Sequence, residues 1–155
     1  MSTQALSSRQ ELRNADDATI EDAIAYADPM VLRGLLYQLT GDPEVAATGT
    51  KTVQTGYFEV AAAATEQDVA LLRRKGAAFL KSHRDDGAGQ LSIGPSERLP
   101  ASLSLMLGRT LRGEELHHYI EETAIDPAVR SLRWQETPDP ARMKDFTVTV
   151  IGAGM

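Results

Sequence analysis

The periodicity of the sequence changes from helical to strand at residue 146, ten residues before the end. This change constrains the fold more than any other feature. Residues 146–151 are rich in β-branched side chains with apolar residues at every second position, which predicts a strand. Gly152 and Gly154 follow it directly. A strand that runs into G-x-G is typical of a dinucleotide-binding turn, in which the first glycine makes the bend and the second admits a pyrophosphate.

Helical periodicity dominates residues 17–125, ahead of this strand. Capping residues and apolar stripes predict about five packed helices, at residues 17–27, 29–39, 65–84, 100–111 and 114–124. The second of these is apolar more than halfway round, so we expect it to be central in the core. Residues 44–55 have the composition of a loop, and residues 61–64 are compatible with the start of a helix. The fold class expected is therefore mainly α.

The expected domain order follows from these boundaries. We expect a flexible tail at 1–16, a helical domain at 17–125, an extended connector at 126–144, and the first strand and G-x-G turn of a truncated domain at 145–155. The connector contains three prolines and many charges, and Trp134 is expected to anchor it on the surface.

Composition excludes several classes of function. The chain of 155 residues has a net charge of −6, whereas nucleic-acid and anionic-membrane binders need a basic face. It has no cysteine, which excludes disulfides, thiolate catalysis and cysteine-ligated zinc. No segment approaches the roughly 18 apolar residues of a spanning helix, and no signal peptide is recognisable. We expect a cytoplasmic protein without nucleic-acid or membrane partners.

One short segment has the spacing of metal ligands. Glu114 and His117, and likewise Glu115 and His118, form Glu-x-x-His pairs of the kind used in di-metal helical bundles. Such a site needs the motif on two helices, and here both pairs share one, so a solvated helix face is favoured. The basic run at 73–75 is also interpreted as a solvated face. We therefore expect no catalytic residue and no metal ligand.

Three segments, in their order and spacing, resemble one enzyme family. These are residues 39–42 after the Leu-rich helix, Arg133 with Trp134 ahead of a Pro-containing connector, and residues 146–155. Together they resemble the amino-terminal part of 4-hydroxyacetophenone monooxygenase-like enzymes. Those enzymes are Baeyer–Villiger flavin monooxygenases with an additional helical domain ahead of the FAD-binding domain.

The resemblance implies FAD as cofactor and NADPH as reductant of a full-length flavoprotein oxidoreductase. It assigns Gly152 and Gly154 to an incomplete FAD pyrophosphate turn. The third glycine, the acidic ribose-binding residue and the NADPH motif of the family are absent from this sequence, so the chain alone is expected to bind neither cofactor and to be inactive. The implied partners of the helical domain are the missing FAD domain and a second subunit.

A second hypothesis is a self-standing helical protein-interaction module. In that case the strand at 146–151 would be buried by the rest of the chain or would add to the sheet edge of a partner.

Overall fold

The computed structural model describes residues 10–123 and the single residues 139, 141, 144 and 147. The chain divides into two units, residues 1–120 and 121–155, and the described structure belongs almost entirely to the first. Most of the expected connector and nearly all of the expected terminal strand, including Gly152 and Gly154, lie outside the described residues.

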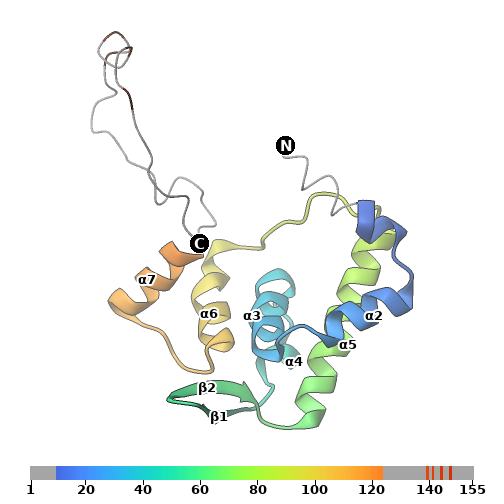
Figure 1. The fold of residues 1–155 in the computed structure, drawn as a ribbon, viewed down its shortest axis with the longest axis horizontal. Helices are drawn as coiled ribbons and strands as arrows, with labels where there is room; N and C mark the ends of the chain where they lie inside the picture. The colour runs from blue at the N-terminus through green and yellow to red at the C-terminus, as the bar shows by residue number, and fades with distance from the viewer. Residues whose placement is uncertain (1–9, 124–138, 140, 142–143, 145–146, 148–155) are drawn as a thin grey trace. The chain divides into compact units, whose positions relative to one another are not determined.

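The described chain is mainly helical, as the sequence predicts (Figure 1). Its helices are α2 (Asp17–Ala25), α3 (Pro29–Thr40), α4 (Pro43–Ala46), α5 (Glu66–Asp85), the 3-10 turn η1 (Ser96–Arg98), α6 (Leu99–Met106) and α7 (Gly113–Glu122). All five expected helices are present. None of the described helices is long and apolar enough to cross a lipid bilayer.

Local capping chemistry explains where these helices begin. The Asp28 carboxylate accepts hydrogen bonds from the amides of Met30 and Val31, at 2.8 and 3.0 Å, just ahead of α3. The residue that caps α2 is Asp16, whose carboxylate accepts from the Thr19 amide at 2.8 Å.

The helical segments depart most from the expectation at two places. The expected helix at 100–111 ends at Met106, because Gly108 adopts a φ of +64° in the left-handed region that stops a helix. The expected flexible tail at 1–16 is wrong for residues 10–14, which are helical. Leu12 in this turn packs against the core cluster, and its burial stabilises the turn. The sequence of these residues shows no helical period that would predict the turn.

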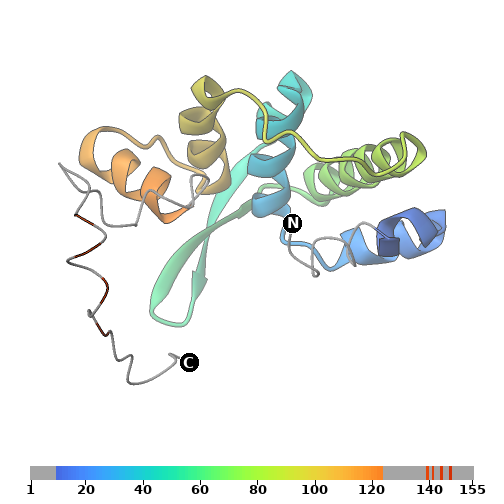
Figure 2. The ribbon, with the colours of Figure 1, turned by 90° about the horizontal axis from the view of Figure 1, so that it is seen from above.

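The helices of the first unit form a row in which α2 packs on α5, α5 on α3 and α3 on α6 (Figures 1 and 2). Helix α3 is central, as predicted. The core cluster consists of Ile20, Ile24, Leu32, Leu36, Val45, Leu72 and Ala77. Each large side chain buried there contributes about 1.5–3 kcal/mol. A Cβ on Gly34 would lie 2.7 Å from the Cβ of Met106, so α3 and α6 can approach this closely only with glycine at that position.

Residues 44–64 contain the main departure from the sequence prediction. In place of a loop and the start of a helix, strands β1 (Thr50–Thr55) and β2 (Phe58–Ala63) form an antiparallel hairpin. Figure 2 shows this hairpin projecting away from the row of helices. A one-turn helix, α4, precedes it, and the Asp42 side chain caps that helix at the Glu44 amide.

The side chain of Arg33 joins the hairpin to the helices. This residue is buried, with only 7% of its surface exposed. Its Nη2 donates to the carbonyl oxygens of Ala46 and Thr48, at 2.9 and 2.8 Å. Its Nε donates to Thr48 Oγ1 at 2.9 Å and its Nη1 to the Leu105 carbonyl at 3.0 Å. Burial lowers the pKa of the Arg33 guanidinium, and these oxygens replace the water that the charge has lost.

We predict that Arg33→Met will destabilise the domain by about 2–4 kcal/mol, because the carbonyls of Ala46, Thr48 and Leu105 lose their buried donor. Urea unfolding followed by circular dichroism measures the change. Arg73→Met is the matched control, since Arg73 is exposed and surface changes of this kind stay within about 0.5 kcal/mol. Equal stability of the two variants would show that the Arg33 network is dispensable.

Candidate interaction surfaces

The hairpin has a regular register and a two-residue turn. Its pairs run from Thr50 opposite Ala63 to Thr55 opposite Phe58 without a bulge. The turn consists of Gly56, with a φ of +61°, and Tyr57. Glycine at the first central position of a two-residue loop is the arrangement of the type II′ turn, whose twist matches that of antiparallel strands.

The two faces of the hairpin differ, because side chains alternate along each strand. Ala61 and Ala63 lie on one face, and Ala63 is buried. A Cβ on Gly108 would lie 2.6 Å from the Cβ of Ala61, so this face packs closely on the turn after α6. Val53 and Val60 are directly paired on the other face, which also carries Phe58.

That second face and the turn expose an unusual amount of apolar surface. Tyr57 is 100% exposed, Phe58 74%, Val60 44% and Val53 38%. We call these four residues the hairpin patch. Contiguous exposed aromatic and aliphatic side chains of this kind mark interaction sites, and tyrosine is among the residues enriched at the centres of interfaces.

The root of the hairpin is held by hydrogen bonds on both strands. Gly49 donates its amide to Asp68 Oδ1 at 3.3 Å, and its carbonyl accepts from the Ala64 amide at 2.9 Å. Thr65 caps α5 and exchanges hydrogen bonds with Asp68 in a capping box. The same Asp68 carboxylate therefore also holds the residue just ahead of β1.

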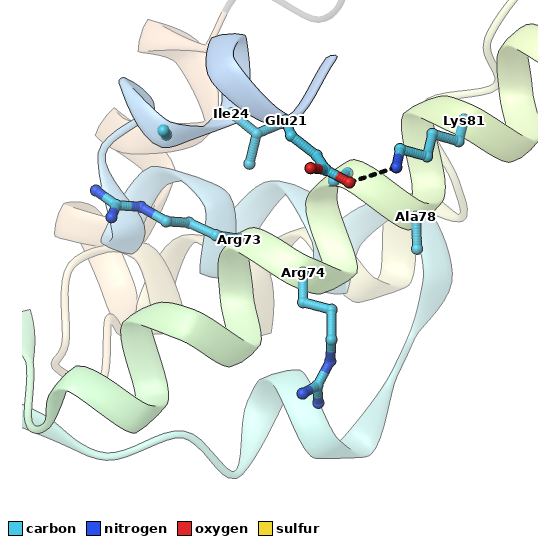
Figure 3. A pocket seen from close by; sticks show the side chains of 8 residues that line it. Glu21, Ile24, Arg73, Arg74, Ala78 and Lys81 are labelled. Carbon is cyan, nitrogen blue, oxygen red and sulfur yellow. Dashed lines mark hydrogen bonds and ion pairs between the residues drawn. The ribbon is translucent and has the colours of Figure 1, made fainter. Parts of the chain in front are cut away.

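A second candidate surface is a groove of about 380 Å³ between α2 and α5. Its lining consists of Glu21, Ile24, Ala25, Arg73, Arg74, Ala77, Ala78 and Lys81. Figure 3 shows Glu21 paired with Lys81 across the groove, while Arg73 and Arg74 extend from α5 in different directions. The lining combines apolar residues of both helices with four charged ones.

Some basic side chains of α5 form ion pairs with carboxylates, and others do not. Lys81 lies 2.6 Å from Glu21 and 3.2 Å from Asp17, and these partners, Glu21 first, raise the pKa of Lys81. By contrast, no hydrogen bond or ion pair joins the side chain of Arg73 or Arg74 to another residue that the structure describes. These two arginines are exposed, which agrees with the interpretation of the basic run as a solvated face. Lys75 of the same run instead pairs with Asp42 at 2.7 Å.

The Glu-x-x-His segment lies on α7, as predicted, and its members are exposed. Glu115 is paired with Arg109, and this interaction lowers the pKa of the Glu115 carboxyl. His118 contacts the ring of Tyr119 edge-on, with centroids 5.9 Å apart. Among the described residues, no group of three or more His, Cys, Asp or Glu side chains is placed to hold a metal ion.

The other expected site residues, Gly152 and Gly154, lie outside the described residues, so the G-x-G turn stays a prediction. The hairpin patch was missed. Its signal was Gly56 between a Thr-rich run at 50–55 and a run at 58–63 that begins with Phe58 and contains Val60. No protein-family model, curated protein or solved structure matches the chain.

We predict that the domain loses stability as the pH falls below about 4, in part through Asp68. The Thr65 side chain, followed by the Gly49 and Thr65 amides, lowers the pKa of this carboxyl below its ordinary value. A group with a lowered pKa in the folded state stabilises the fold above its unfolded pKa, and this stabilisation disappears as protons bind.

Asp68→Asn should therefore show a smaller fall in melting temperature between pH 7 and pH 3 than the unchanged chain. Asp86→Asn is the control, since the exposed Asp86 side chain accepts no hydrogen bond from the described residues. Parallel pH profiles for all three proteins would contradict the role of Asp68.

Proposed function

We propose that this chain is the amino-terminal part of an FAD- and NADPH-dependent Baeyer–Villiger-type monooxygenase. Its helical domain would be a structural and subunit-contact element, without catalysis of its own, in a cytoplasmic enzyme. The flavin would bind to the FAD domain, of which Gly152 and Gly154 would supply the first turn. The partners of the helical domain would be that FAD domain and a second subunit.

The observation that carries the contact role is the hairpin patch. Two aromatic side chains at the end of a projecting hairpin, Tyr57 and Phe58, are 100% and 74% exposed within the described domain. A hairpin in water is only marginally stable by itself. A contact domain provides a reason for such a surface, because the apolar side chains become buried when the partner binds. The monooxygenase assignment depends on the resemblance of the three segments in the sequence.

The monooxygenase assignment is tested by the DNA that follows the codon for Met155. We expect a reading frame, continuous or frameshifted, that supplies the third glycine and the acidic residue of a dinucleotide-binding fold. The protein extended through that frame should be purified with flavin absorbance and should oxidise NADPH in the presence of a ketone. Unrelated downstream sequence would overturn the assignment.

The contact role predicts the effect of removing the two aromatic side chains. The double variant Tyr57→Ser, Phe58→Ser should fold normally and bind the separately produced FAD domain roughly 10–100-fold more weakly, as expected for loss of a hot spot. Isothermal titration calorimetry measures the affinity. Tyr26→Ser is the matched control, because Tyr26 is 92% exposed but lies at the end of α2. Equal affinities for the two variants would count against the hairpin patch as the contact.

The hairpin patch also favours the second hypothesis, a self-standing interaction module. The two hypotheses differ in the role of residues 145–155. Deletion of these residues should leave the melting temperature unchanged if they begin another domain, and should lower it by several degrees if the described domain buries them.

A further inference from the structure

Strand β1 is the outer strand of the hairpin, and no other strand in the part of the chain that the structure describes pairs with its outer edge. All six of its residues are exposed, whereas β2 packs against α3 and α5. Natural sheet edges are usually protected by proline, bulges or several charges. Residues 50–55 contain no proline and one charge, Lys51, and their pairing with β2 has no bulge.

The register identifies the backbone groups along this edge. The pair that closes a two-residue turn, Thr55 with Phe58, exchanges hydrogen bonds, and such pairs alternate along an antiparallel ladder. The N–H and C=O groups of Thr50, Thr52 and Gln54 therefore point away from β2. These groups are available to an additional strand.

We propose that this strand is β1 of a second copy of the chain, so that two hairpins form one four-stranded antiparallel sheet. The proposal rests on the subunit-contact part of the proposed function and specifies which partner the hairpin meets and how. A twofold axis perpendicular to the sheet relates two antiparallel strands, so the same segment serves on both sides and the assembly closes as a dimer.

Charge and side-chain shape select the register. An axis through Lys51 would place two lysines directly opposite each other, which destabilises a sheet. An axis through Thr52 would place Lys51 opposite Val53. An axis through Val53 avoids both arrangements: Lys51 faces Thr55, and Thr52 faces Gln54.

In this register, the exposed faces of the two hairpins merge. Val60 already pairs with Val53 within one copy, so the sheet acquires a central row in the order Val60, Val53, Val53 of the second copy and Val60 of the second copy. β-branched side chains stabilise each other when they are direct cross-strand neighbours. The 38% and 44% exposure of these two valines in the single chain would decrease.

Strand pairing over so few residues buries less area than the roughly 1,200–2,000 Å² of a stable protein interface. We therefore expect a concentration-dependent dimer, and a test by covalent capture suits it best. The chain contains no cysteine, so one introduced cysteine is the only thiol.

Val53→Cys in the full 155-residue chain should form a disulfide-linked dimer under mild oxidation. The two residues would be a non-hydrogen-bonded pair with Cα atoms about 4.5 Å apart, which is within the range of a disulfide. Lys51→Cys is the matched control on the same strand and face. Its two copies would lie roughly 13 Å apart, four residues along the strand, and should cross-link at least about tenfold less.

A second variant tests the hydrogen bonds. Thr52→Pro removes an outward N–H that the hairpin does not use, and sedimentation should show a monomer at concentrations where the unchanged chain dimerises. Thr52→Val retains the N–H and should still dimerise. Circular dichroism confirms that each variant is folded.

Equal cross-linking of Val53→Cys and Lys51→Cys, or no cross-linking of either, would overturn the strand pairing. If the hairpin meets only the FAD domain, Val53→Cys stays monomeric while the Tyr57 and Phe58 variant still weakens FAD-domain binding. That result would reject the dimer and leave the proposed function standing. Conversely, specific Val53→Cys dimers together with unrelated downstream DNA would reject the monooxygenase assignment alone.

Discussion

The arrangement of the described domain depends on one buried cation, Arg33 of α3. Its guanidinium reaches the carbonyl oxygens of Ala46, Thr48 and Leu105, which belong to the segment ahead of β1 and to the end of α6. No carboxylate lies within ion-pair distance of it among the described residues. Carbonyl dipoles instead compensate the charge, and they do so only when α3, the segment ahead of β1 and the end of α6 are all in place. The hairpin is thereby fixed to α3 and α6 by direction-sensitive bonds, which apolar packing alone would not provide.

Sequence reasoning succeeded where the determinants are local. Asp28 followed by Pro29 specifies the beginning of α3, and Gly41, with a φ of +70°, specifies its end. The same holds for the capping box of Thr65 and Asp68. Each of these signals is complete within a few residues, so it is visible in a single sequence.

The hairpin could not be found in this way, because its strands do not alternate between apolar and polar residues. Both faces of β1 are exposed, so burial imposes no period of two on Thr50–Thr55. Nothing in the sequence distinguishes Arg33 from a surface cation of a helix either, since its partner Leu105 lies 72 positions away. The candidate surface was therefore missed for a physical reason. Its strand residues are exposed on both faces, and the side chain that anchors it makes a contact over 72 positions.

The short loop between β1 and β2 has a consequence for the order of folding. All pairs within the hairpin join residues 50–63, so the hairpin can close on the microsecond timescale typical of such elements. The packing of α3 against α6 must wait for a segment some sixty residues further along, and contacts of that separation form slowly. During synthesis the outer edge of β1 would thus exist before α5, whose Asp68 holds the root of the hairpin, and before α6. Unwanted strand pairing between neighbouring nascent chains would occur at this ribosome-bound stage. Rapid folding of α5 and α6 would shorten the time during which such pairing is possible.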